Sequence, residues 1–324
     1  TEKVSLERIS CGKVFLEAGK VLTGITPSWG ILTGVRPAKL AIDGLMKGKN
    51  KTEVRNFLTK EYLVNPKKAA LVTDIASTEK KLLSHVKERT CSIYISIPFC
   101  PSRCSYCSFV SFTSSKLLGL LDSYLERLCH DFEETVNIIK NLGLTVSTVY
   151  IGGGTPTTLN PAQLKILLDT VTSHLDPSAL EEFTLEAGRP DTINEEKLHI
   201  IKAYGVNRIS INTQTINDDV LELVGRKHTA ADFYRAFEMA RKEDIQHINT
   251  DLIAGLPGEG FGSFSETIDA MIRLHPDNLT FHTLCIKNAA DFAHNKNKLY
   301  MNTFSETSKC VDYSQLSAKN AGYI

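Results

Sequence analysis

Residues 91–110 read C-S-I-Y-I-S-I-P-F-C-P-S-R-C-S-Y-C-S-F-V. The largely apolar run before Cys100 predicts a β-strand over 92–98. Cys100, Cys104 and Cys107 follow with the spacing C-x3-C-x2-C. Three thiols so close together cannot share one face of a regular helix, whereas a loop can wrap them around a metal cluster. The stretch therefore predicts a strand that leads into a metal-binding loop.

Thiolates are the usual ligands of iron–sulfur clusters, and a fully ligated [4Fe–4S] cluster takes four of them. Three cysteines at this spacing predict a cluster that keeps one iron open, as a catalytic metal keeps a free position. A zinc site completed by a distant Cys or His is the alternative, although zinc sites usually pair two such motifs and only one is present. The other five cysteines are expected to be small buried residues. They are Cys11, Cys91, Cys129, Cys285 and Cys310.

From residue 91 onward, strand-like apolar runs alternate with helical stretches. The strands are expected at 92–98, 147–151, 182–187, 207–212, 247–253 and 278–286. The helices are expected between them, at 117–142, 161–175, 194–204, 230–242 and 264–274. Such alternation predicts a parallel sheet with right-handed crossovers. Six strands are too few for a closed eight-stranded barrel, so we expect an α/β fold with a partial (β/α)6 barrel over 89–290.

The 88 residues before this region are rich in Lys and Gly and have a different pattern. Helices are expected there at 37–46, 51–62 and 66–87. Residues 1–88 are therefore expected to form a small, mostly helical accessory domain. Near the end of the chain the periodicity is lost, so 291–324 is expected to be a C-terminal tail, unless the natural chain continues past Ile324.

Polar side chains recur where the expected strands end. The run I-G-G-G-T-P-T at 151–157 closes the second strand, and its glycines let a ligand approach the backbone. Glu186 ends the third strand, and Gln214 ends the fourth. Arg226 follows shortly afterwards, and Asp251 lies within the fifth strand. Each alone could be a cap or a structural ion pair, but together they indicate a site at the barrel mouth.

The composition is that of a globular protein, with 42% hydrophobic and 23% charged residues, and it excludes a disordered chain or a collagen. Lys and Arg total 37, as do Asp and Glu, so no overall positive field attracts nucleic acid. The sequence has no apolar run of about 20 residues to span a membrane. Its charged N-terminus lacks the apolar segment of a signal peptide. We therefore expect a cytoplasmic protein without a membrane span or a nucleic-acid partner.

The stretch Y-I-S-I-P-F-C-P-S-R-C-S-Y-C-S-F at 94–109 resembles the signature of radical S-adenosylmethionine (SAM) enzymes. More narrowly, it resembles the oxygen-independent coproporphyrinogen III oxidase family, which has HemN, HemW and HemZ types. The resemblance runs from about residue 91 to residue 286. The stretch W-G-I-L-T-G-V-R-P at 29–37 is similar to the HemZ branch and extends the match over most of the chain.

The resemblance implies that Cys100, Cys104 and Cys107 ligate a [4Fe–4S] cluster beside bound SAM. Arg226 would suit the carboxylate of SAM through paired hydrogen bonds. Cys285 falls where the sixth strand would reach the adenine, with contact through its backbone. No side chain is assigned a catalytic role of its own. The implied cofactor-binding positions are Tyr94, Tyr106, Gly153, Gly154, Thr155, Glu186, Gln214, Arg226, Asp251 and Cys285.

By the same resemblance, the reaction is the oxidative decarboxylation of coproporphyrinogen III to protoporphyrinogen in haem biosynthesis, with electrons from a donor such as flavodoxin or ferredoxin. Two residues depart from the pattern of the porphyrinogen-oxidising members: Phe109 replaces a fourth cysteine, and Ser96 replaces a histidine. The His-Asn and Tyr-Trp motif of the haem chaperones is absent, because the only tryptophan is Trp29. The alternatives are a haem- or tetrapyrrole-binding, chaperone-like protein that keeps the cluster, and a radical SAM enzyme acting on another tetrapyrrole.

Overall fold

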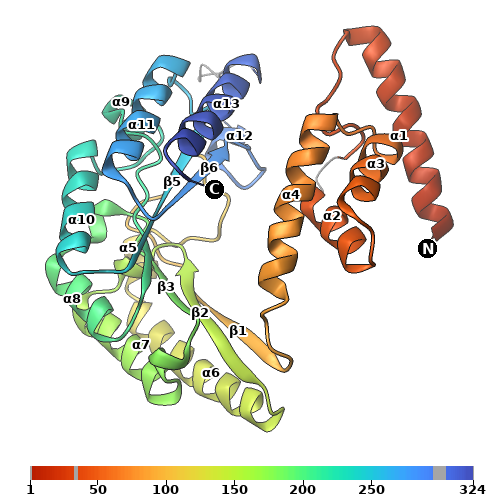
Figure 1. The fold of residues 1–324 in the computed structure, drawn as a ribbon. Helices are drawn as coiled ribbons and strands as arrows, with labels where there is room; N and C mark the ends of the chain where they lie inside the picture. The colour runs from red at the N-terminus through yellow and green to blue at the C-terminus, as the bar shows by residue number, and fades with distance from the viewer. Residues whose placement is uncertain (1, 33–35, 295–303, 324) are drawn as a thin grey trace. The chain divides into compact units, whose positions relative to one another are not determined.

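The computed structural model describes residues 2–32, 36–294 and 304–323. Its contacts divide the chain into two compact units, Thr1–Glu88 and Arg89–Ile324, each with a hydrophobic core of its own. In Figure 1 the first unit runs from red to orange, and the second continues to blue. None of the described helices combines the length and the apolarity needed to cross a lipid bilayer.

The described part of the first unit is helical, and its local sequence explains where the helices begin. Asn50 and Glu53 form a reciprocal capping box at the start of one helix. Asn65 caps the next helix, with Pro66 at its first position. An apolar stripe from each of these helices fills a small core that includes Leu58. The helices are α1 (Glu2–Thr23), α2 (Pro37–Met46), α3 (Lys51–Glu61) and α4 (Pro66–Leu83).

The W-G-I-L stretch at 29–32 is fixed against the end of α3. The Ile31 N–H donates to the Tyr62 carbonyl at 2.9 Å. Gly30 has a φ of +57°, and a Cβ there would lie 2.0 Å from the same carbonyl oxygen. Only glycine therefore fits at this position. Residues 33–35, which belong to the same motif, lie outside the described residues.

The second unit is built on one parallel sheet whose six strands follow the order of the chain, β1-β2-β3-β4-β5-β6. This arrangement confirms the expected α/β partial barrel. The register pairs Ile151 of the second strand with Ile95 of the first and Leu185 of the third. The strands are β1 (Thr90–Ile97), β2 (Thr145–Gly153), β3 (Glu182–Glu186), β4 (Arg208–Ser210), β5 (His247–Ala254) and β6 (Asn278–Thr283).

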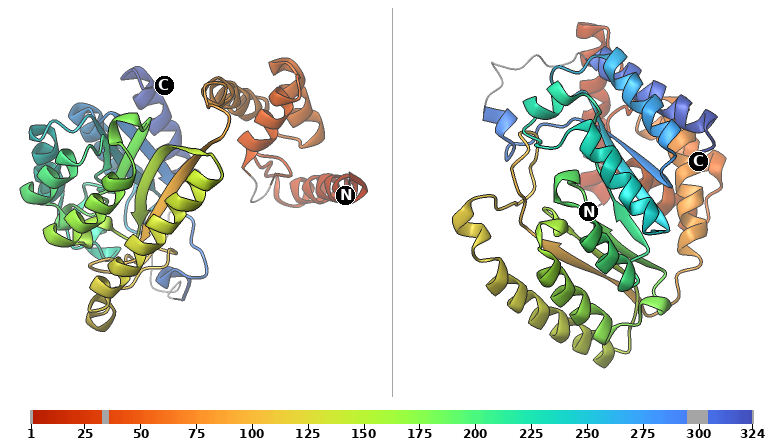
Figure 2. Two further views of the ribbon diagram at one scale, coloured as in Figure 1. Left: turned by 90° about the horizontal axis from the view of Figure 1, so that it is seen from below. Right: turned by 90° about the vertical axis from the view of Figure 1, so that its left-hand side faces the viewer.

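Helices cover the outer face of this sheet, as Figures 1 and 2 show. The core between the two layers is apolar and includes Leu167, Phe183, Phe233 and Phe264, all fully buried. The covering helices are α6 (Leu121–Asn141), α7 (Pro161–His174), α8 (Glu195–Ala203), α10 (Ala230–Lys242) and α11 (Phe261–Leu274). Shorter helices are η1 (Pro156–Thr158), η2 (Pro177–Ala179), η3 (Pro190–Thr192), α5 (Ser115–Leu118), α9 (Asp218–Leu223) and α12 (Asp291–His294).

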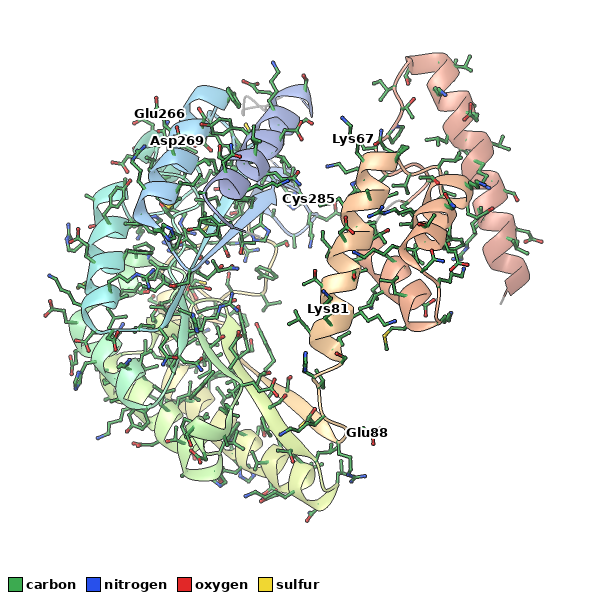
Figure 3. The ribbon with its side chains drawn as sticks, viewed as in Figure 1. Lys67, Lys81, Glu88, Glu266, Asp269 and Cys285 are labelled. Atoms are coloured by element: carbon green, nitrogen blue, oxygen red, sulfur yellow. The ribbon has the colours of Figure 1, made fainter. Side chains whose placement is uncertain are left out.

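The structure differs from expectation at the C-terminal end. The segment expected as a tail contains a long helix, α13 (Phe304–Asn320), which packs against α11. Its Cys310 and Ser314 side chains are buried, and the Tyr313 hydroxyl donates to Asp269 at 2.8 Å. Figure 3 labels Asp269 on α11. Burial of a narrow stripe on an otherwise polar helix accounts for the weak sequence pattern. Residues 295–303 lie outside the described residues.

Candidate functional site

A cavity of about 600 Å³ opens at the carboxyl ends of the strands. The cysteine loop after β1 lines one part of it, and residues within the other strands or after their ends line the rest. A neighbouring hollow of about 350 Å³ shares Gly153 and Glu186 with the cavity and adds Tyr94. Every expected cofactor or metal position lines the cavity except Tyr94, which lines only the hollow.

The cysteine loop is shaped by hydrogen bonds to distant parts of the chain. The Cys100 N–H donates to the Phe112 carbonyl at 3.1 Å, and the Ser105 N–H donates to the Val224 carbonyl at 3.0 Å. The Cys100 sulfur lies 3.3 Å from the Thr155 hydroxyl, which follows β2. These contacts turn the thiols toward a common cavity.

The thiols of this loop differ in burial, Cys104 being buried and the other two partly exposed. Burial raises the pKa of Cys100 and of Cys107. Without a metal these two thiols therefore hold their protons more tightly than a thiol in water does. Metal binding would have to displace those protons.

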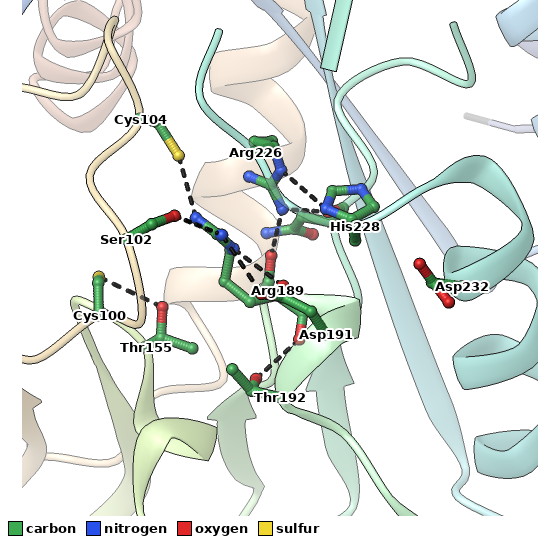
Figure 4. A network of polar contacts seen from close by, with 12 residues as sticks. Cys100, Ser102, Cys104, Thr155, Arg189, Asp191, Thr192, Arg226, His228 and Asp232 are labelled. Atoms are coloured by element: carbon green, nitrogen blue, oxygen red, sulfur yellow. Dashed lines mark hydrogen bonds and ion pairs between the residues drawn. The ribbon is translucent and has the colours of Figure 1, made fainter. Parts of the chain in front are cut away.

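Arg189 is a buried cation that contacts this loop, and sequence reasoning did not assign it. It follows β3 in the stretch E-A-G-R-P. Its Nη1 donates to the Cys104 sulfur at 3.3 Å, and its Nη2 donates to the Ser102 hydroxyl at 2.8 Å. Asp191 forms an ion pair with it at 3.1 Å. Figure 4 shows the group. In the sequence, the only sign of this ion pair was that Arg189 and Asp191 stand two residues apart.

Arg226 is also buried, and it connects the cysteine loop to the ends of β3 and β4. Its guanidinium donates to the Tyr106 hydroxyl at 3.2 Å, to the Gly188 carbonyl at 2.7 Å and to the Asn212 carbonyl at 2.6 Å. Its Nε donates to His228 Nδ1 at 3.3 Å. Within the described part of the chain, these bonds use four of its five N–H groups. The expected two-point binding of a carboxylate would therefore require one bond to break.

His228 completes this group, which sequence reasoning also missed. Burial, followed by the positive charge of Arg226, lowers the pKa of His228 to about 3. The ring is therefore neutral at physiological pH and accepts the Arg226 hydrogen bond through Nδ1. A neutral acceptor suits this place because a second positive charge would repel the guanidinium.

Glu186 lies at the end of β3 and is paired with Tyr150 of β2. The Tyr150 hydroxyl donates to Glu186 Oε1. Burial raises the pKa of Glu186, although the tyrosine hydrogen bond opposes that effect. Tyr94 stacks on Tyr150 with ring centroids 5.7 Å apart. The sequence indicated that Glu186 needed a partner, but it did not identify Tyr150.

Asp251 of β5 receives hydrogen bonds from two amides. Asn249 donates to one carboxylate oxygen at 2.8 Å, and Asn212 donates to the other at 3.0 Å. His282 Nε2 on β6 lies 3.9 Å away. Burial raises the pKa of Asp251, but His282, followed by the Asn249 hydrogen bond, outweighs burial, and the net pKa lies below the ordinary value. Gln214, with a φ of +73°, pairs its backbone with that of Asp251 and Ile253.

Two further expected positions complete the cavity wall. Gly154 allows β2 to approach the cysteine loop, because a Cβ there would lie 2.6 Å from the Phe99 carbonyl oxygen and 3.0 Å from the Cys100 sulfur. Cys285 follows β6 and is exposed (Figure 3). The expectation that it is buried was wrong, as it was for Cys11. Its neighbours Leu284 and Ile286 pack against a small hydrophobic cluster that includes Ile253 and Phe292, whereas the Cys285 side chain faces away from it and is exposed.

The three loop cysteines fit a group larger than a single ion. All three line one cavity, whose volume can hold an inorganic cluster together with a small organic molecule. Across residues 2–32, 36–294 and 304–323, no three His, Cys, Asp or Glu side chains are arranged to hold one metal ion.

Comparison with known proteins identifies the class. Residues 94–271 match the model of the radical SAM superfamily, which covers more than half of the chain. The protein therefore belongs to the radical SAM superfamily. Proteins of this superfamily use a [4Fe–4S] cluster and SAM.

Individual relatives are more specific than the superfamily match. Over its whole length, the chain is 36% identical to the oxygen-independent coproporphyrinogen-III oxidase-like protein HemZ of Bacillus subtilis and spans 66% of that protein. Over 60% of its length, it is 39% identical to the haem chaperone HemW of the same organism and spans 51% of it. It matches the solved structure of coproporphyrinogen III oxidase (HemN) from Escherichia coli with a TM-score of 0.65 and 26% identity, covering 76% of this chain and 56% of HemN.

Proposed function

We propose that this chain is the radical SAM part of a cytoplasmic enzyme that converts coproporphyrinogen III to protoporphyrinogen by oxygen-independent oxidative decarboxylation. The observation that carries the proposal is the single cavity in which three cysteines face polar side chains from the strand ends. The whole-length similarity to HemZ supports the choice of substrate.

In this proposal Cys100, Cys104 and Cys107 hold the cluster. When bound there, a [4Fe–4S] cluster and SAM would supply radical chemistry that removes hydrogen from the substrate, with electrons from a donor such as flavodoxin or ferredoxin. The protein binds and orients the reactants and keeps water away from them. The partial burial of the thiols and the cavity of about 600 Å³ that they line suit this task.

The polar residues opposite the cysteines are the proposed SAM contacts. Glu186 and Asp251 carry carboxylate oxygens that suit amino and ribose hydroxyl donors. Arg226 keeps one N–H for a ligand carboxylate. The remaining proposed contacts come from Tyr94, Tyr106, Gly153, Gly154, Thr155, Gln214 and the backbone of Cys285.

The neighbouring hollow is the proposed substrate side. Its wall is mainly apolar and includes Tyr94, Phe109 and Val110, whose relative exposures are 62%, 69% and 72%. Exposed apolar side chains beside a polar cavity indicate a ligand with an extended apolar face. A tetrapyrrole ring has such a face, whereas its carboxylates need polar partners.

The test is anaerobic reconstitution of the protein with iron and sulfide, followed by incubation with coproporphyrinogen III, SAM and a reductant. Mass spectrometry should detect protoporphyrinogen together with about two molecules of 5′-deoxyadenosine for each one, because two side chains are decarboxylated and each needs its own hydrogen abstraction. A Cys104→Ala variant serves as the control without a cluster. Release of methionine while the porphyrinogen stays unaltered would contradict the proposed substrate.

A haem chaperone is the second candidate, favoured by the HemW relatives and by Phe109 at the position where porphyrinogen-oxidising members carry a cysteine. In that case the reconstituted protein would bind haem tightly and form no 5′-deoxyadenosine. A radical enzyme for another tetrapyrrole would form 5′-deoxyadenosine only when its own substrate is supplied.

A further inference from the structure

The guanidinium of Arg189 is an unusual neighbour for a cysteine sulfur because it is almost fully buried. Its side chain is 4% exposed. Its Nη1 donates to the sulfur of Cys104, which is itself 8% exposed. An electrostatic interaction acts more strongly in such a poorly hydrated place than at the surface. Figure 4 shows that the contact joins the loop after β3 to the cysteine loop.

Asp191 determines which edge of the guanidinium faces the sulfur. Its two carboxylate oxygens accept from Nε at 3.1 Å and from Nη2 at 3.4 Å. This side-on pairing leaves Nη1 to reach Cys104. The turn that carries both residues is itself held, because Lys197 donates to the Thr192 carbonyl at 2.9 Å.

We propose that Arg189 is a positioning residue that raises the reduction potential of the cluster bound by Cys104. Hydrogen bonds to ligand sulfur and nearby positive charge both stabilise the more negative, reduced state. Asp191 acts in two ways: it orients the donor, and its negative charge offsets part of the effect of Arg189. The inference rests on the cluster assignment made above, but it does not depend on the substrate.

The experiment is an anaerobic redox titration of the reconstituted full chain, with the reduced cluster followed by electron paramagnetic resonance. Arg189→Gln removes the charge, and Arg189→Lys keeps it without the forked geometry. Asp191→Asn removes the opposing charge and retains a hydrogen-bond acceptor. Arg241→Gln is the matched control, because Arg241 forms an ion pair with Asp277 at 2.8 Å near the start of β5, at the other end of the sheet.

Arg189→Gln is expected to lower the ratio of reduced to oxidised cluster about tenfold at a given potential, a shift of about 59 mV toward negative values for one electron. Arg189→Lys should shift it less, and Asp191→Asn should shift it to more positive values. The control should leave the potential unchanged. A potential in Arg189→Gln equal to that of the wild type, at equal iron content, would overturn the inference.

Measuring the iron content of each variant distinguishes failure of this inference from failure of the proposed cluster and function. A wild-type protein that takes up no iron overturns the cluster assignment, and this inference fails with it. If Arg189→Gln loads no iron, the Lys and Asn variants decide. If Arg189→Lys and Asp191→Asn both leave the reduction potential unchanged, or both fail to bind iron, then Arg189 only supports the fold. Either result would contradict its role in setting the potential.

Discussion

The sulfurs of Cys100, Cys104 and Cys107 have different neighbours, although they share one cavity. Replacing any one of them with alanine should reduce bound iron to background, because two thiolates are too few to retain a cluster. Iron per chain and visible charge-transfer absorbance after anaerobic reconstitution measure this. Cys129→Ala is the control, since its partly buried thiol lies on α6 outside the cavity. An alanine variant at 100, 104 or 107 that loads iron normally would contradict the assignment.

Glu259 provides a pH-dependent prediction away from the cluster. Burial raises the pKa of this carboxyl to about 7, against a hydrogen bond from Thr215 that lowers it. The folded chain therefore holds a proton that the unfolded chain releases near pH 4.5, and its stability falls as the pH rises from about 4.5 to about 7. Above about pH 7 this loss of stability has reached its full value and no longer changes with pH.

Glu259→Gln removes this loss and keeps an oxygen for Thr215. The variant should exceed the wild type in free energy of unfolding by up to about 3 kcal/mol at pH 8, at about 1.4 kcal/mol per pKa unit. The difference should shrink toward pH 5. Urea denaturation of both proteins at several pH values measures it. A difference that does not vary with pH would show that Glu259 is ionised throughout.

Individual site residues were predictable where the sequence places a polar group in an apolar strand end. Glu186 met this condition, Asp251 lies within an apolar strand instead, and both line the cavity. Tyr150 and Asn249 were not identified because a buried parallel strand has no clear alternation to show which side chains face inward. Arg189 was visible in the sequence, but its contact with Cys104 depends on how two loops meet in space.

At the scale of elements, the approach of the β2 turn to the cysteine loop depends on Gly154. A methyl group in Gly154→Ala would collide with the Phe99 backbone and the Cys100 sulfur. The variant should lose about 1–3 kcal/mol of stability and release iron faster to a chelator. Gly262→Ala is the control, since a Cβ there meets nothing within 4 Å. Equal iron release from both variants would contradict this view of the turn.

The strands and most helices followed from the sequence because hydrophobic period and length agree in them. The expected helix at 117–142 is divided into α5 and α6 around Gly119. Helix α1 was not predicted because many of its apolar side chains, such as Phe15 and Val21, are exposed and show no buried stripe. Helix propensity and hydrophobic periodicity identify helices that pack against a core, but they give only a weak signal for helices that bury few side chains.

At the scale of the whole molecule, the hydrophobic core of the first unit shares no residue with the two hydrophobic clusters of the second. All residues lining the cavity fall between 100 and 287, within the second unit. A fragment of residues 89–324 is therefore expected to unfold cooperatively and to load as much iron as the full chain. Circular dichroism and iron analysis of both proteins measure this. A fragment that folds but takes up no iron would show that residues 1–88 contribute to the metal site.

The partners that shape the cysteine loop have a consequence for the timing of its maturation in the cell. The loop is complete by residue 107, yet its contacts come from Thr155, Arg189, Val224 and Phe292. A ribosome must add almost two hundred more residues before the last of these is available. Until then the cysteine loop lacks these contacts, so we expect iron to be inserted after the barrel has been translated.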